Sequence, residues 1–119
     1  MNKFLLFKDK LKTSLQNLPG IEAQLKMAPI TRLQELQKQR NSAKPRKSAV
    51  LILFYTYKEK LMLVLMKRTD DNTVHSGQIS FPGGKYEKQD KNLQETALRE
   101  ANEEMGIIPE KVEIIGELS

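Results

Sequence analysis

The chain has 119 residues, of which 39% are hydrophobic and 29% are charged, and it contains no cysteine. These values fit one soluble domain and exclude disulfides and thiol chemistry. No apolar run approaches the roughly 18 residues that a membrane-spanning helix needs, so we expect no membrane span. The first apolar run is also too short for a secretory signal peptide, and the lack of cysteine fits a reducing, cytoplasmic location.

The net charge of +5 is unevenly distributed. Residues 1–50 carry eleven Lys and Arg against three Asp and Glu, whereas residues 51–119 carry nine against twelve. A basic arm can bind nucleic acid or an anionic membrane surface, or attract a polyanionic substrate. This arm lacks interleaved aromatic residues and any nucleic-acid module signature. We therefore expect no nucleic-acid partner, and a solvated helix surface is the simplest interpretation.

Residues 1–44 are predicted to form a basic, largely helical N-terminal extension and linker. Apolar residues at spacings of three and four predict an amphipathic helix over residues 3–17, namely Phe4, Phe7, Leu11, Leu15 and Leu18. Pro19 and Gly20 end this helix. Shorter helical pieces are predicted over residues 21–28 and 31–36, and a linker over residues 41–47.

The composition changes at Ser48, where an apolar region begins. Residues 49–57 form a continuous apolar, β-branched and aromatic run, which predicts a central strand buried on both faces. A polar turn at residues 58–60 and a second strand at 61–66 complete a hairpin. A loop, a short strand and a Pro-Gly-Gly turn follow, at residues 69–73, 78–81 and 82–84.

A helix is predicted to begin after Asn92, because Asn92 and Glu95 have the spacing of a capping box. Gly106 is expected to end it as a left-handed cap. Leu98, Ala101 and Met105, with Ala97 beside them, share one side, which we expect to pack on the sheet. A further strand is predicted over residues 112–115.

Three carboxylates lie on one face of this helix, at Glu100, Glu103 and Glu104. Like charges at positions i and i+4 repel, so stacking Glu100 on Glu104 is unfavourable by itself. The arrangement is explained if Mg²⁺ or Mn²⁺ binds there, because both ions prefer oxygen ligands and bridge readily to phosphates. The alternative is a solvated acidic face.

The surrounding segment resembles the Nudix box, the signature of the Nudix hydrolases: Gly-x5-Glu-x7-Arg-Glu-U-x-Glu-Glu-x-Gly-U, where U is apolar. The matching residues are Gly84, Arg99, Glu100, Glu103, Glu104, Gly106 and Ile107. Asp90 replaces the first glutamate, the following gap is one residue longer, and Ala101 is small for its apolar position. We expect the loop before the helix to absorb the extra residue.

Residues 65–84 are similar to the signature of the coenzyme A pyrophosphatase branch of this family. Its matching positions are Arg68, Gly77, Phe81, Pro82, Gly83 and Gly84, whereas Val64, Met66, Thr69 and Thr73 depart from it. Thr73 replaces an arginine that could reach a nucleotide phosphate. The resemblance implies metal-dependent hydrolysis of a nucleoside diphosphate linked to another moiety, with the pyrophosphate of coenzyme A or its derivatives as the first candidate. Another Nudix specificity (ADP-ribose, a dinucleotide or a nucleoside triphosphate) and a non-catalytic nucleotide- or protein-binding fragment stay as alternatives.

The resemblance also implies roles for individual residues. The metal ligands would be the Gly83 carbonyl with Glu100, Glu103 and Glu104, and Arg99 would complete the catalytic set by orienting Glu103. The substrate contacts would be Arg68, Gly77, Phe81 and Gly84. Arg68 has an alternative, an ion pair with Asp70 or Asp71, and His75 is expected to be a loop residue. The general base is either a glutamate of the box or a carboxylate further along the chain.

The implied fold is α/β, a Nudix α/β/α sandwich with a mixed sheet. The Nudix domain would begin at residue 45, with its box at about residues 84–107. Such a sheet needs strands and a helix after the box. We therefore expect a domain that is truncated after the box, with its missing elements in a longer protein or supplied by a partner chain, as in a homodimer.

Overall fold

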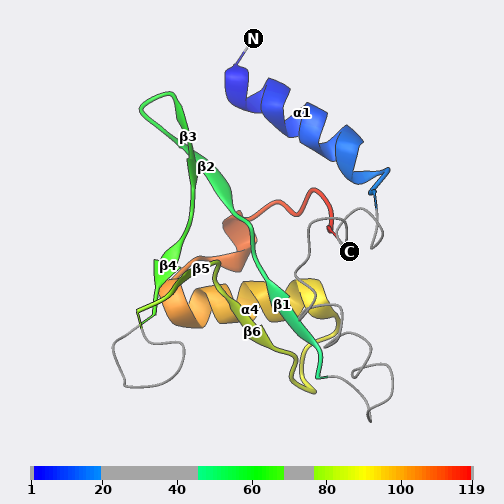
Figure 1. Ribbon diagram of the computed structural model, residues 1–119, viewed down its shortest axis with the longest axis vertical. Helices are drawn as coiled ribbons and strands as arrows, with labels where there is room; N and C mark the ends of the chain where they lie inside the picture. Colours follow the sequence, from blue (N-terminus) through cyan, green and yellow to red (C-terminus); the bar gives the residue numbers. More distant parts are fainter. Residues whose placement is uncertain (1, 20–45, 69–76, 119) are drawn as a thin grey trace, which may run out of the picture. The chain divides into compact units, whose positions relative to one another are not determined.

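A computed structural model describes residues 2–19, 46–68 and 77–118 (Figure 1). Outside these residues lie the predictions for the short helical pieces, for most of the linker, for the loop at 69–73 and for His75. The chain divides into two compact units, residues 1–45 with 115–119 and residues 46–114. Each is described by itself.

The first unit contains helix α1, Lys3–Leu15. Its N-cap is Asn2, whose side chain accepts a 2.9 Å hydrogen bond from the Phe4 amide. The predicted N-terminal helix is thus confirmed, although it ends at Leu15, before the proline. None of its residues is buried. Neither α1 nor the other helix of the described residues is long and apolar enough to cross a bilayer.

The second unit begins with six short strands that form three antiparallel pairs. The strands are β1 Ser48–Val50, β2 Phe54–Tyr57, β3 Lys60–Leu63, β4 Met66–Lys67, β5 Ile79–Ser80 and β6 Gly83–Lys85. β1 pairs with β6, β2 with β3 and β4 with β5. Further backbone hydrogen bonds extend the pairs: Leu51 to Pro82 and Tyr86 to Lys47 for β1 and β6, Val64 to Leu53 for β2 and β3, and Arg68 to Gln78 for β4 and β5.

The turn between β2 and β3 is as tight as predicted. Tyr57 pairs with Lys60, so Lys58 and Glu59 are the two central residues, and both have positive φ, 48° and 64°. Two consecutive left-handed residues are typical of the type I′ turn, whose twist matches that of a hairpin.

The prediction of one central strand buried on both faces is wrong. Residues 51–53 interrupt it, and Val50 and Tyr57 are 60% and 57% exposed. The reason is that the two ends of the run have different partners: β1 pairs with β6 and β2 with β3. The β1 end also packs on a helix, and Leu51 is the one residue of the run that is buried.

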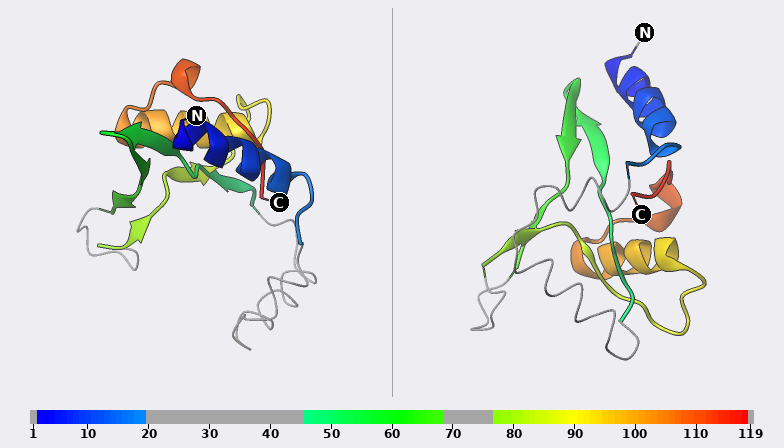
Figure 2. Two further views of the ribbon diagram at one scale, coloured as in Figure 1. Left: turned by 90° about the horizontal axis from the view of Figure 1, so that it is seen from above. Right: turned by 45° about the vertical axis from the view of Figure 1, so that its right-hand side comes forward.

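That helix is α4, Leu93–Met105, which lies across β1 and β6 (Figures 1 and 2). Ala97 and Ala101 meet Leu51 in a small core. The partly buried side chains around it are those of Ala49, Leu53, Leu98, Ile107 and Ile114. Small alanines let the helix approach the strands closely. The inclusion of Met105 in this face is wrong, because Met105 occupies the last turn of α4 and is 41% exposed.

Both predicted caps of α4 are present. The Asn92 side chain accepts from the Glu95 amide at 2.9 Å, and Gly106 closes the helix with a φ of 70°. The Glu95 carboxylate accepts from the Lys91 amide at 2.8 Å, one residue before the position that a capping box predicts.

After α4 the chain forms a 3₁₀ turn, η1 Pro109–Lys111. The predicted strand at residues 112–115 is wrong: the segment is extended at Val112 but belongs to none of the three sheets described. A strand needs a neighbour for its backbone hydrogen bonds, and every described partner lies between residues 48 and 85. The small sheets and the two helices of the described residues are compatible with the predicted α/β class. The three-layer sandwich, its mixed sheet and the truncation stay predictions.

Candidate metal centre

Two carboxylates of α4, Glu100 and Glu104, face the glycines of β6. The Gly83 amide donates to Glu104 Oε1 at 3.3 Å. A Cβ atom built on Gly84 would lie 2.5 Å from Glu100 Cδ and 2.6 and 2.9 Å from its two oxygens. The Glu100 carboxylate therefore fills the space that any other residue at position 84 would need.

Position 83 likewise has no room for a side chain, but here backbone atoms occupy the space. A Cβ on it would fall on the carbonyl oxygen of Ala49 and lie 2.6 Å from Val50 Cα. The predicted turn at these glycines is wrong, since both lie within β6, and among the glycines that the structure describes it is Gly77 and Gly106 that have positive φ. Close approach, rather than an unusual φ, explains why glycine occupies both positions.

The pair of carboxylates carries unfavourable negative charge. Glu104 is exposed as a residue, but partial loss of hydration at its carboxyl group is the main cause that raises its pKa above the usual value, and the charge of Glu100 and a hydrogen bond between the two carboxyl groups raise it further. The Gly83 amide and the positive charge of Arg68 act in the opposite direction. A cation bound between the two carboxylates would relieve this repulsion.

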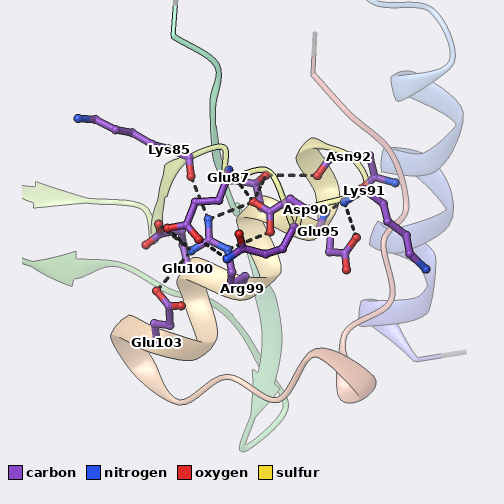
Figure 3. Close-up of polar contacts among 11 residues, drawn as sticks. Lys85, Glu87, Asp90, Lys91, Asn92, Glu95, Arg99, Glu100 and Glu103 are labelled. Carbon is purple, nitrogen blue, oxygen red and sulfur yellow. Dashed lines mark hydrogen bonds and ion pairs between the residues drawn. The ribbon is translucent and has the colours of Figure 1, made fainter.

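Glu103, the third predicted ligand, points elsewhere. Its side chain is 58% exposed and accepts from Arg99 Nη1 at 3.4 Å. The same nitrogen donates to Glu100 Oε1 at 3.1 Å, and Figure 3 shows Arg99 among these acidic side chains. The contact that was predicted between Arg99 and Glu103 exists, but the one to Glu100 is shorter.

The strongest partner of Arg99 is Asp90, which stands in the box in place of its first glutamate. Asp90 is 4% exposed, and Arg99 grips both of its oxygens, with Nε at 2.9 Å and Nη2 at 3.1 Å. The Glu87 amide and the Thr96 hydroxyl donate to it as well, at 3.0 and 2.9 Å. These bonds, with that to Arg99 first, lower the pKa of Asp90 from 3.8 to about 2 although burial opposes the change. The signal in the sequence was the acid at the start of the box.

Arg99 thereby joins three segments. Besides its bonds to Asp90, its Nη2 donates to the Lys85 carbonyl at 2.9 Å, and its Nη1 lies 3.7 Å from Glu87 Oε1. The guanidinium holds β6, the loop at residues 86–91 and α4 together (Figure 3). That loop contains a turn closed by a 3.0 Å bond from the Asp90 amide to the Glu87 carbonyl, and the longer gap of the box leaves Asp90 within reach of Arg99.

The predicted substrate contacts are distributed unevenly. Gly84 lies in the site, and the charge of Arg68 acts on Glu104, so Arg68 belongs to the same surroundings. Its alternative partners, Asp70 and Asp71, lie outside the described residues. Gly77 has the positive φ of a turn, 72°, and Phe81 is half-buried just before β6. Substrate binding by these residues stays a prediction.

Across residues 2–19, 46–68 and 77–118, no group of three or more His, Asp or Glu side chains has the arrangement of a metal site. The structure brings Glu100 and Glu104 together and leaves Glu103 with Arg99. Two carboxylates beside the partly buried backbone of Gly83 and Gly84 are nevertheless donors of the kind that Mg²⁺ and Mn²⁺ prefer, and Mg²⁺ often takes one or two carboxylates and keeps several waters. The residues present therefore fit such an ion.

The sequence model of the NUDIX domain family matches residues 45–119, more than half of the chain. The chain therefore belongs to the Nudix family, as the box predicted.

Relatives carry the same family name. The chain is 43% identical over 84 residues to Nudix hydrolase 15, mitochondrial, from Arabidopsis thaliana, an alignment that covers 70% of this chain and 30% of the relative. It is 44% identical over 87 residues to an uncharacterized Nudix hydrolase, NudL, from Yersinia enterocolitica, with 73% and 44% covered. For Nudix hydrolase 22, chloroplastic, from Arabidopsis thaliana, the identity is 45% over 73 residues, with 60% and 24% covered. The chain thus spans less than half the length of these relatives.

Proposed function

We propose that this chain carries the metal-binding part of a Nudix pyrophosphohydrolase, which hydrolyses a nucleoside diphosphate linked to another moiety. One observation supports this most directly: Glu100 and Glu104, both residues of the Nudix box, face each other beside Gly83 and Gly84. Repulsion between two carboxylates is costly unless a cation or a proton offsets it. A site that takes up cations suits a polyphosphate substrate, because the cations offset the negative charge of the phosphates.

In this proposal Glu100 and Glu104 hold Mg²⁺ or Mn²⁺, and the Gly83 carbonyl completes the protein's share of the ligands. The bound ion would supply positive charge to the diphosphate oxygens and activate water for attack on phosphorus. Glu103 is the side chain that must turn to join the site. It is free to do so because it is exposed and its bond to Arg99 is long.

In this proposal Arg99 orients a metal ligand and Arg68 attracts the substrate. Arg99 keeps Glu100 in place from its anchored position on Asp90. Arg68 offers a positive charge near Glu104. A substrate phosphate could take the place of the Glu104 carboxylate as the partner of Arg68. Hydrolysis adds water across the phosphoanhydride: one P–O bond forms to the attacking oxygen, the bridging P–O bond breaks, and two phosphate products leave.

For the substrate we propose the pyrophosphate of coenzyme A or its derivatives. This assignment rests on the sequence match at Arg68, Gly77 and the Phe81-Pro82-Gly83-Gly84 run. Thr73, which departs from that pattern, lies outside the described residues, and ADP-ribose, a dinucleotide or a nucleoside triphosphate are the alternatives. The cytoplasmic location stays a prediction, because two plant relatives are named mitochondrial and chloroplastic. Homodimer formation likewise stays a prediction.

A hydrolysis panel tests the proposal. The protein at its native length is incubated with Mg²⁺ or Mn²⁺ and with coenzyme A, ADP-ribose or dATP. The expected result is release of phosphopantetheine and 3′,5′-ADP from coenzyme A. Turnover of ADP-ribose alone would assign another specificity. No turnover of any of the three compounds would favour a binding module.

Two variants show whether the activity belongs to this site. Glu104→Gln should lower the rate by at least about a hundredfold, since it removes a charged ligand. Glu110→Gln, the matched change at an exposed position of η1, should leave the rate unchanged. Equal rates for the two variants would remove Glu104 from the mechanism.

A further inference from the structure

Thr96 lies one turn into α4 and has a role that the Nudix box does not assign. It is 0% exposed, the most deeply buried polar residue of the described chain. Its hydroxyl lies 2.9 Å from Asp90 Oδ2 and 3.2 Å from the Asn92 carbonyl. A hydroxyl has one proton to donate, and the charged carboxylate, being the nearer and stronger acceptor, should receive it.

This hydrogen bond begins a chain of contacts that leads to the metal centre. Thr96 holds Asp90 Oδ2, Asp90 receives Nε and Nη2 of Arg99, and Arg99 Nη1 donates to Glu100 Oε1. Asp90 comes from the loop, whereas the other three residues come from α4. Thr96 is therefore the second point, besides Arg99, at which the helix fixes the loop carboxylate.

The hydrogen bond from Thr96 to Asp90 matters because the side chain of Asp90 is short. An aspartate has one methylene fewer than the glutamate of the motif, so its carboxylate must be held close to the helix to meet the Arg99 fork. The Glu87 amide fixes it from the loop side. Without the Thr96 hydroxyl, Arg99 would be the only donor from the helix side among the bonds to Asp90 described above.

We propose that Thr96 is a positioning residue that sets the geometry of the acidic site through Asp90 and Arg99. Thr96 holds Arg99 in this position whether or not a metal ion is bound. The effect of Thr96 on metal affinity rests on the function proposed above. Loss of the hydroxyl should leave Arg99 free to turn and Glu100 free to leave the glycine surface. Partners of this kind typically change metal affinity by about 10- to 100-fold.

The test compares Thr96→Val, which removes the hydroxyl at nearly constant volume, with Thr96→Ser, which keeps it. In the metal-free protein, NMR follows the exchange of the Arg99 Nε–H proton, which is donated to Asp90. We expect exchange to be at least about tenfold faster in Thr96→Val and within about twofold of wild type in Thr96→Ser. Mn²⁺ titration should then give an affinity about tenfold weaker for the valine variant alone.

The outcomes separate this inference from the proposed function. A folded Thr96→Val protein with unchanged Arg99 exchange would overturn the positioning role, whatever the metal does. Altered Arg99 exchange in a protein whose wild type binds no Mn²⁺ would support the positioning role and contradict the metal centre. If Thr96→Val does not fold, Thr96→Ala also removes the donor and places a good helix former in α4, and wild-type exchange in it would overturn the inference.

Discussion

A methyl group on Gly84 should damage the candidate metal centre while leaving the fold nearly intact. In the structure, a Cβ at this position lies 2.5 Å from Glu100 Cδ and 2.6 Å from its nearer oxygen. Ordinary contacts between such atoms are about 3.5 Å, so the Glu100 carboxyl group must move by about 1 Å in Gly84→Ala. It can do so because it is the end of a flexible side chain.

Gly84→Ala should therefore lower the activity much more than the stability, because the clash displaces a side chain and not the backbone. A displacement of about 1 Å at a reacting centre can lower the rate about a hundredfold. The free energy of unfolding should change by less than about 1 kcal/mol, because a side-chain rotation relieves the clash and Gly84 has no positive φ to lose.

Gly83→Ala is the matched control, because its methyl group would meet the backbone of Ala49 and Val50. Backbone cannot move aside so easily, and the expected loss of stability is roughly 1–3 kcal/mol. Urea unfolding of both variants, with Mn²⁺ titration and hydrolysis assays on the folded proteins, gives the comparison. Wild-type metal affinity and activity in Gly84→Ala would refute the placement of Glu100 against β6.

Three further results are expected. As pH falls from about 4 to 2, the stability that the Asp90 carboxylate contributes above its unfolded pKa should be lost, because its folded pKa is lowered to about 2; urea unfolding across this range should show the loss in wild type and not in Asp90→Asn. Asn92→Ala removes the cap bond to the Glu95 amide and should lower the free energy of unfolding by about 1 kcal/mol, measured with urea at neutral pH, whereas an unchanged value would show that the cap contributes nothing. Since the pKa of Glu104 is raised, protons should compete with Mn²⁺ from higher pH than for an ordinary carboxylate. Calorimetric titrations should show that Mn²⁺ affinity falls as pH falls, and that it falls less steeply in Glu104→Gln. Equal slopes in the two proteins would contradict competition at Glu104.

Local signals in the sequence predicted the helices well. The cap at Asn92, the left-handed Gly106 and the spacing of the apolar residues define α4 without reference to anything distant. The spacing of Glu100 and Glu104 likewise placed both on one face. These features depend on residues within one or two turns, so a pattern can carry them.

Features that depend on distant partners were not predicted. The run from Ala49 to Tyr57 reads as one buried strand, yet its two ends pair with different segments, and Leu51 alone among its residues is buried. The glycines of β6 were assigned to a turn, because no local pattern shows that a helix carboxylate and another strand occupy the space around them. The four donors to Asp90 come from the loop and from α4, and the pattern revealed only that an acid stood there.

The most direct test of the metal centre is where Mn²⁺ binds. In amide NMR spectra of the wild-type chain, substoichiometric Mn²⁺ broadens the signals of nuclei near the bound ion. We predict that Gly83, Gly84 and Glu100 broaden first, that Glu110 stays sharp, and that Glu100→Gln combined with Glu104→Gln abolishes the selective broadening. Broadening that is uniform, that centres on another segment, or that persists in the double variant would contradict a metal centre at these carboxylates.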